Sequence, residues 1–195
     1  VQADYASGSG SDTLLFTYTI VSGDNESQGI SIPDTAVSLN GGSIRDLAGN
    51  TASLASSYVS PDAGYMVDTA LPTITSVAVV GDIGLQNSRL NAGDLAYVKL
   101  ITSEDVVLTG TPTLTIEIGA TLVDASFAGF GNANELYFSY QILPGQNDSN
   151  GISIPPDALA LHGGSLKDAA GNAAVVTSAA VDNDPLYLVD TTAPN

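Results

Sequence analysis

The chain has 195 residues, enough for one or two domains that each bury a core, and its 21 acidic and 4 basic residues give a formal net charge of −17. This charge argues against binding to nucleic-acid phosphates and to anionic membrane surfaces. The chain has no cysteine, so disulfide bonds cannot stabilise it, and it has no apolar run of transmembrane length, which argues against insertion into a membrane.

Apolar runs of period two, bounded by Gly, Asn, Asp and Pro, predict β-strands, and no segment has a helical period. In the second part of the chain these runs cover residues 73–80, 95–101, 113–118, 121–127, 136–142, 152–154, 159–161, 173–177 and 187–189. Strands of this length and spacing predict an all-β fold, an antiparallel immunoglobulin-like Greek-key β-sandwich.

An internal repeat organises the chain. The segment LLFTYTIVSGDNESQGISIP, which begins at Leu14, recurs as LYFSYQILPGQNDSNGISIP from Leu136, and the offset of 136 − 14 = 122 holds without a gap to the end of the chain. About 33 of the 73 overlapping positions are identical, which indicates two copies of one module.

The repeat predicts two unequal domains in tandem. Residues 73–195 form one complete module, and residues 1–72 form only the C-terminal part of a preceding one. Part of a sandwich leaves open strand edges and an uncovered apolar face, so residues 1–72 should not fold alone. Either the chain derives from a longer array, which we favour, or a neighbouring molecule completes the first module.

Five short motifs occur in one order in the complete module: AGDL, SEDVVLTGTPTLTIEIG, LYFSYQILPGQNDSNGISI, LALHGGSLKDAAGN and YLVDTTAP. In this order the chain resembles the bacterial immunoglobulin-like repeats of giant type I-secreted and biofilm-associated surface adhesins. The resemblance implies an extracellular, often calcium-dependent extender on the bacterial cell surface. Its partners would be adjacent repeats of the same protein, and the ligand at the distal tip would be bound elsewhere.

The sandwich topology predicts a metal site at the junction between modules. The loop after the second strand, which contains Glu104, and the turn Asp168–Asn172 should lie at the same end of the module as the linker residue Asp68. Calcium binds six to eight oxygens from carboxylates, amides and backbone carbonyls. We therefore expect Asp68, Glu104, Asp168 and Asn172 to bind Ca²⁺ and to fix the angle between modules.

The repeat extends this expectation to other junctions. Asp46 and Asn50 are equivalent to Asp168 and Asn172 and would serve the previous junction, whereas Asp190 would serve the next one. The alternative is that Asp-x-Ala-Gly-Asn is only a turn, in which the Asp accepts backbone N–H bonds and the Gly supplies positive φ. The sequence leaves both interpretations open.

A second acidic loop is weaker as a calcium site. The loop Gly23–Gly29 and its copy Gly145–Gly151 partly match an Asp-x-Asp-x-Asp-Gly calcium turn, but both lack the later bidentate acid. An Asx-type turn is the preferred interpretation.

Catalysis has little support. His162 is the only histidine, and its repeat partner is Asn40, so the position does not require imidazole. Two alternatives to a spacer remain. One is a carbohydrate-binding module, for which Phe127 and Phe130 are the best exposed-aromatic candidates. The other is a subunit of a self-assembling extracellular fibre or surface layer, which neighbouring chains would complete.

Overall fold

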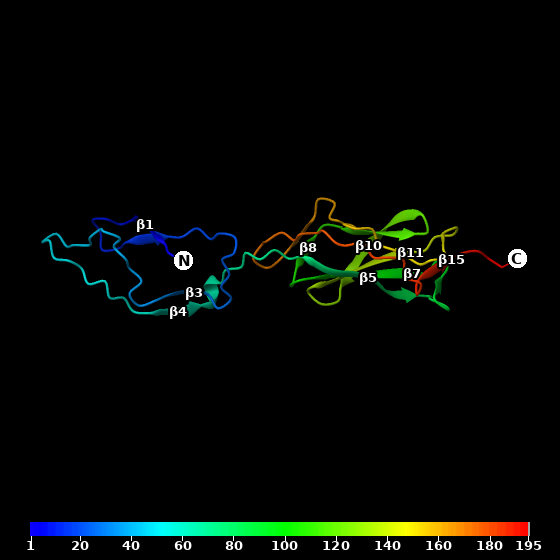
Figure 1. Ribbon diagram of the computed structural model, residues 1–195, viewed down its shortest axis with the longest axis horizontal. Coiled ribbons are helices and arrows are strands. Elements are labelled where there is room, and N and C mark those ends of the chain that lie inside the picture. Colours follow the sequence, from blue (N-terminus) through cyan, green and yellow to red (C-terminus); the bar gives the residue numbers. More distant parts are fainter. Residues whose placement is uncertain (195) are drawn as a thin grey trace. The chain divides into compact units, whose positions relative to one another are not determined.

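The computed structural model describes residues 1–194, and every side chain among them except that of Asp82; residue 195, the last of the predicted second module, lies outside this range. The chain divides into two units, Val1–Ala70 and Leu71–Asn195 (Figure 1). Both are all-β, which confirms the predicted class, and the one helical segment described is the 3₁₀ turn Ala63–Tyr65. No helix in the described part of the chain is long and apolar enough to cross a membrane.

The second unit is built on a six-stranded sheet in the order β13-β9-β10-β11-β7-β5, in which all neighbours are antiparallel. Side chains of β7 and β9 alternate between buried and half-buried, as period two requires. The strands are β5 (Ile74–Ile83), β7 (Leu95–Thr102), β9 (Thr113–Ile118), β10 (Thr121–Phe130), β11 (Glu135–Gln141) and β13 (Leu159–Ala160).

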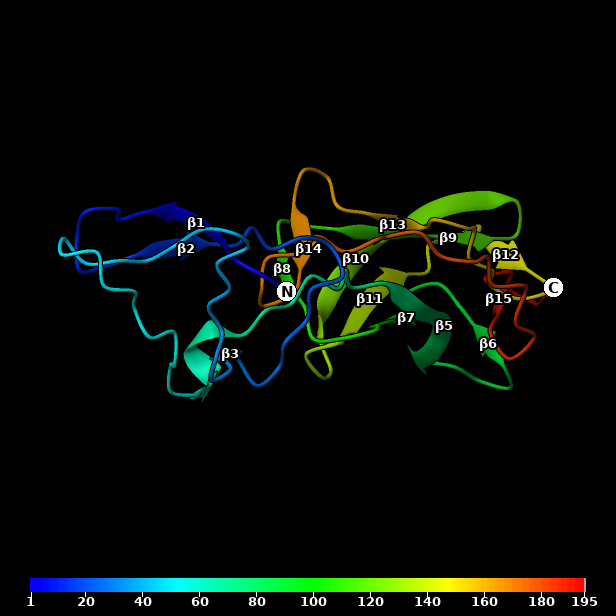
Figure 2. The same cartoon turned by 60° about the vertical axis from the view of Figure 1, so that its left-hand side comes forward.

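Two smaller sheets lie at opposite ends of this unit (Figures 1 and 2). At one end β8 (Val107–Thr109) pairs antiparallel with β14 (Ser165–Lys167). At the other end β15 (Leu188–Asp190) pairs antiparallel with β12 (Asn147–Asp148) and parallel with β6 (Arg89–Leu90). The loops that carry the acidic motifs adjoin these small sheets.

The long strands were predicted better from the sequence than the short ones. The strand at 113–118 is confirmed to the residue, but the strands predicted at 152–154 and 173–177 are wrong, because these segments form only isolated bridges. Backbone N–H groups of the second segment go to two different partners, Leu166 O and Pro72 O, so no continuous ladder forms. Strands β6, β8, β12 and β14 have two or three residues each, too few for a period to be visible.

The buried apolar core lies entirely in the second unit among the described residues. Residues 73–122 and residues 123–195 contribute to it almost equally, nine side chains from the first range and ten from the second. The nine are Val79, Leu90, Ala96, Val98, Leu100, Val106, Leu114, Ile116 and Ile118, and the ten are Ala125, Leu136, Phe138, Ile142, Ile152, Ile154, Ala158, Leu159, Leu166 and Val189.

The first unit has two short hairpin-like sheets. Strand β1 (Asp4–Ser7) pairs with β2 (Leu15–Thr17), and β3 (Ile30–Ile32) pairs with β4 (Val59–Asp62). The pairing of β1 with β2 reproduces that of β10 with β11 at the offset of 122. Tyr5 faces Phe16 as Phe127 faces Phe138, and both ladders have a bulge at the next residues. The sequence repeat is therefore also a repeat of backbone geometry.

One glycine in each unit, at the end of the acidic loop, lies against the backbone of a later segment. Gly29 and Gly151 have positive φ angles of 96° and 99°. A Cβ atom on Gly29 would overlap the carbonyl oxygen of Asp62, and one on Gly151 would overlap that of Asp184. Both the dihedral angle and the close backbone approach therefore require glycine.

The unequal burial of equivalent residues predicts unequal mutational costs. We expect Phe138→Ala to lower the free energy of unfolding of the second unit by about 3–5 kcal/mol, because it opens a cavity in the core. Phe16→Ala removes a ring that is still 40 % exposed, and we expect it to change that transition by less than about 0.5 kcal/mol. Denaturant unfolding of the two full-length variants measures both values, and equal costs would contradict the division of the core described above.

Candidate metal centre

The turn Asp168–Asn172 follows β14 and is closed by its own first and last residues. The backbone N–H of Asp168 donates to Asn172 O at 3.1 Å, and that of Gly171 donates to Asp168 O at 3.3 Å. The Asp168 carboxylate accepts two further bonds, from Asn172 N to Oδ1 at 2.8 Å and from Asn172 Nδ2 to Oδ2 at 2.7 Å. We call this arrangement the Asp–Asn clasp.

The first unit contains the same clasp. Asp46 Oδ1 accepts from Asn50 N at 2.8 Å and Asp46 Oδ2 accepts from Asn50 Nδ2 at 2.7 Å. The turn geometry expected from Asp-x-Ala-Gly-Asn is thus present in both copies. A carboxylate has about four lone-pair sites, so an aspartate in this turn can accept more than the two bonds from its asparagine.

Hydrogen bonding, rather than a neighbouring positive charge, sets the ionisation of the clasp aspartate. Burial of Asp168, which is 6 % exposed, is the largest single influence and acts to raise its pKa. The hydrogen bonds from the side chain and backbone of Asn172, with those from the backbone of Gly171 and Ala170, together outweigh burial and hold the pKa below its ordinary value. The pKa of Asp46 is lowered in the same way, first by the Asn50 side chain. Both aspartates are therefore anionic at neutral pH.

Glu104 lies next to the clasp of the second unit. Glu104 and Asp168 each offer a carboxylate oxygen, and these two atoms lie within 4.8 Å of each other. Glu104 is half-buried, and Asp168 is buried. Two unit charges at this separation repel by on the order of 1–3 kcal/mol, depending on the local dielectric. A cation between them would turn this repulsion into attraction.

The loop that carries Glu104 is held in place by its neighbours. The buried hydroxyl of Thr102 donates to Glu104 O at 2.7 Å, and Thr102 O accepts from Asn134 Nδ2 at 3.3 Å. Ser103 and Thr73 exchange two bonds, from Ser103 N to Thr73 O at 2.8 Å and from Thr73 N to Ser103 Oγ at 3.0 Å. The beginning of the second unit is thus fixed beside the Glu104 loop.

Asp68 and Asp190 each stand near the end of a unit in the sequence. Asp68 belongs to the first unit, two residues before its end, and its Oδ1 accepts from Ala70 N at 2.9 Å. Its equivalent Asp190, in β15, accepts from Thr192 N at 3.1 Å, and β15 lies at the end of the second unit opposite to β14, which precedes Asp168 (Figure 2). The structure therefore brings Glu104, Asp168 and Asn172 together within the second unit and separates them from Asp190.

The acidic loop Gly145–Gly151 is an Asx-type turn, as expected. Asp148, only 3 % exposed, accepts from Gly119 N at 2.7 Å on Oδ2, and from Gly151 N at 2.8 Å and Asn150 N at 3.1 Å on Oδ1. Its oxygens thus serve backbone N–H groups. The sequence predicted a turn at this loop. It did not predict that Asp148 is buried, because the N–H of Gly119, which donates to Asp148, lies 29 residues away in the chain.

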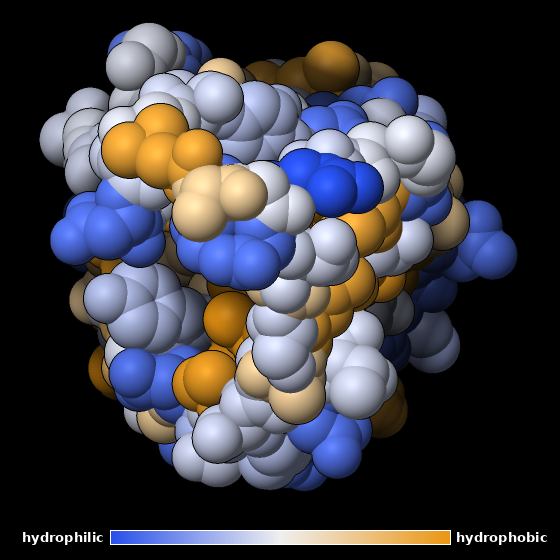
Figure 3. Space-filling view, turned by 90° about the vertical axis from the view of Figure 1, so that its left-hand side faces the viewer, coloured by the Kyte–Doolittle hydropathy of each residue, from blue (hydrophilic) through white to orange (hydrophobic). Residues whose placement is uncertain are grey.

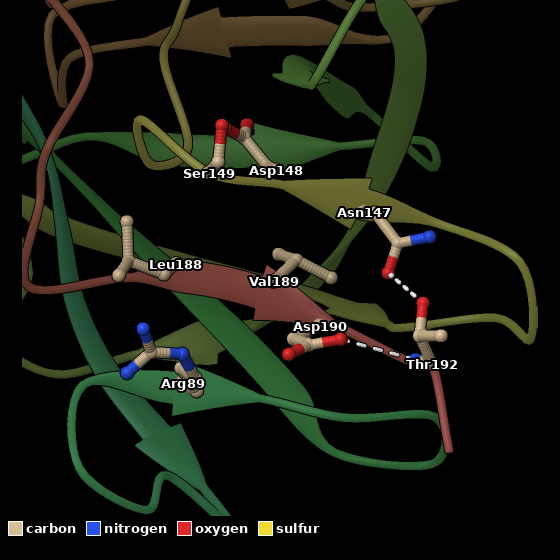
Figure 4. A pocket seen from close by; sticks show the side chains of 8 residues that line it. All are labelled: Arg89, Asn147, Asp148, Ser149, Leu188, Val189, Asp190 and Thr192. Atoms are coloured by element: carbon tan, nitrogen blue, oxygen red, sulfur yellow. Dashed lines mark hydrogen bonds between the residues drawn. The ribbon is translucent and has the colours of Figure 1, made fainter. Parts of the chain in front are cut away.

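A shallow pocket of about 410 Å³ adjoins this loop (Figure 4). One side chain–side chain hydrogen bond lies in it, from Thr192 Oγ1 to Asn147 Oδ1 at 3.3 Å, and Asp190 Oδ1 accepts from the Thr192 backbone N–H at 3.1 Å. The lining residues are Arg89, Asn147, Asp148, Ser149, Leu188, Val189, Asp190 and Thr192.

The two aromatic candidates for sugar binding are in different environments. Phe127 packs against the core, with its ring edge-to-face against Phe138 at 5.8 Å and against Phe130 at 5.4 Å. Phe130 is exposed. Only one of the two rings could therefore offer a free face to a sugar.

The lowered pKa of Asp168 predicts an acid-sensitive clasp. A carboxyl group whose pKa is lower in the folded state adds stability that is present above its unfolded pKa, about 3.9, and is lost as the pH falls through its folded value. With chelator present, we expect the melting temperature to fall as the pH drops below about 5, and Asp168→Asn to make this fall shallower. The variant Asp105→Asn, which changes an exposed carboxylate next to Glu104 in the sequence, serves as control. An equal fall of the melting temperature with pH in the wild type and in Asp168→Asn would contradict the prediction.

The chain matches no protein-family model, and comparison with curated proteins and with solved structures gave no match either.

Proposed function

We propose that the chain is a segment of an extracellular extender, in which tandem immunoglobulin-like modules are stiffened by calcium at their junctions. Its role would be structural rather than enzymatic, as in the repeats of bacterial surface adhesins that its motifs resemble. The 122-residue repeat, seen in sequence and in the β1–β2 and β10–β11 ladders, supports a tandem array.

The topology of the second unit favours an immunoglobulin-like Greek key. Strand β11 lies between β10, which precedes it, and β7, from much earlier in the chain. This return of a later strand to an earlier one is the defining connection of that fold family. Together with the small sheets β8–β14 and β6–β12–β15, it supports a sandwich built from one module of the repeat.

The observation that carries the calcium proposal is the pair of carboxylates from Glu104 and Asp168 within 4.8 Å. Hard divalent cations prefer such oxygens, and the clasp amide Asn172, backbone carbonyls and water can complete a shell of six to eight. The chain's charge of −17 gives a further reason for a cation, because it relieves self-repulsion.

Asp68 is the third carboxylate that we assign to this centre. Pro72 is anchored to the second unit, since its carbonyl accepts from Val175 N at 2.8 Å. Only three residues lie between Asp68 and Pro72, a tether of at most about 14 Å, so the Asp68 carboxylate can reach the Glu104 loop. An ion held by Asp68, Glu104 and Asp168 would then couple one module to the next.

The repeat gives every module the same two half-sites. Asp46 and Asn50 form the clasp that would serve a preceding junction, and Asp190 occupies the place of Asp68 before a following one. Linkers between modules are hinges by default, and a bound ion would stiffen each hinge. The function of the modules would then be to provide length and stiffness, and their partners would be adjacent repeats. Another part of the parent protein would recognise the distal ligand.

Calcium should stabilise the full chain through Glu104. At free calcium about 100-fold above the dissociation constant, we expect a gain of about 2.7 kcal/mol, visible as a higher melting temperature than in chelator. Glu104→Gln should lose most of this gain, whereas the neighbouring change Asp105→Asn, which removes the same charge from an exposed side chain, should keep it. An identical response of both variants would reduce the effect to general charge neutralisation, and no response of the wild type would refute the site.

Asp68 should matter for stiffness more than for folding. We expect small-angle scattering of the full chain to show a narrower range of interunit arrangements in calcium than in chelator. Asp68→Asn should remove this difference without changing the melting temperature in chelator by more than about 1 °C, because Asp68 is an exposed residue. A calcium-independent scattering profile of the wild type would contradict the stiffened-junction proposal even if the ion binds.

A further inference from the structure

The first unit has the side chains of half a core. The ten buried apolar positions of residues 123–195 have equivalents in the first unit at the offset of 122, and every one of these is apolar. They are Ala3, Leu14, Phe16, Ile20, Ile30, Ile32, Ala36, Val37, Ile44 and Val67. None of the ten is buried.

The difference in exposure between equivalent residues is large. Phe16 is 40 % exposed against 0 % for Phe138, Ile20 is 45 % against 1 % for Ile142, and Ile30 is 48 % against 0 % for Ile152. Hydrophobic surface is visible between hydrophilic side chains on the face turned toward the viewer in Figure 3. Apolar surface of this extent marks an interaction site.

The second unit shows what covers these positions. There the nine other core side chains come from residues 73–122, mainly from β7 and β9. Strand β7 also pairs with β11 along Glu135–Gln141, with Leu100 opposite Leu136 and Val98 opposite Phe138. In the first unit, β2 is the equivalent of β11, and among the described strands it pairs with β1 alone. The first unit therefore lacks an equivalent of β7 among its described strands, both over its apolar face and along the edge of β2.

We propose that the exposed face and free edge of the first unit bind a segment with the strand pattern of residues 73–122, joined directly ahead of Val1. Its β7-like strand pairs antiparallel with β2, and its alternate apolar side chains cover Phe16, Ile20 and Ile30. The connection favours a segment in the same chain. The equivalent of Val1 is Val123, the third residue of β10, and a tight turn joins β10 to β9. A segment joined at Val1 needs only this short turn to reach the face, so its effective concentration is high.

The test is a fusion of residues 73–122 to Val1 of the full chain, which restores the register because the residue after Leu122 is the equivalent of Val1. Hydrogen exchange at the amides of Leu15–Thr17 and Ile30–Ile32 should slow at least about 100-fold relative to the unfused chain. A matched fusion with Val98→Asp and Leu100→Asp in the added segment only should give no such protection. In the completed unit, we expect Phe16→Ala to lower the melting temperature by several degrees, the effect also expected of Phe138→Ala in the second unit.

Three outcomes would overturn the proposal. The first is unchanged exchange in the fusion, and the second is equal protection by the segment that carries the two aspartates. The third is protection that already exists in the unfused chain and rises with its concentration in parallel with sedimentation as a dimer, which would assign the face to a second copy. The inference rests on the core positions and is independent of calcium.

Discussion

The structure depends on burying one apolar core that neither half of the repeat can build alone. In the second unit, residues 73–122 and 123–195 supply nine and ten of the buried apolar side chains, and the two sets pack together across the six-stranded sheet. Burial of each such side chain stabilises the fold by roughly 1.5–3 kcal/mol, so losing one set removes most of the driving force for folding. The first unit keeps its hairpin register, its clasp and its turns, but its apolar side chains remain open.

The hydrogen bonds of the clasp turns join residues that are close in the sequence, whereas the core joins residues that are far apart in it. The Asp–Asn clasp uses groups within five consecutive residues, so it forms identically in both units. The core needs pairing between strands as far apart as β7 and β11, and only the second unit has both. The local turns therefore form in both units, whereas a buried core forms only where both sets of strands are present.

Period and repeat together predicted much of the fold, and their failures have identifiable causes. Strand 113–118 was predicted to the residue because alternation there runs for six residues. The segment 173–177 is a short apolar run, Ala-Ala-Val-Val-Thr, but its N–H groups bond to Leu166 and Pro72, which lie on different segments. Spacing pointed to Glu104 and Asp168, since the topology of a sandwich places both loops at one end. It could not reveal the bond from Gly119 to Asp148, because no local pattern links a carboxylate to an amide 29 residues away.

The glycines at 29 and 151 bear on how such a repeated gene can vary. A change in an inward-facing residue harms only a unit whose core is assembled. A side chain at either glycine instead collides with a carbonyl oxygen of its own unit, that of Asp62 or Asp184, whether or not a core is present. Copies of this module could therefore drift at many inward positions, as Val37 and Ile44 have against Leu159 and Leu166, while the glycine stays fixed. Positions that stay identical between diverged copies would then be those at which backbone geometry, rather than core packing, restricts the residue type.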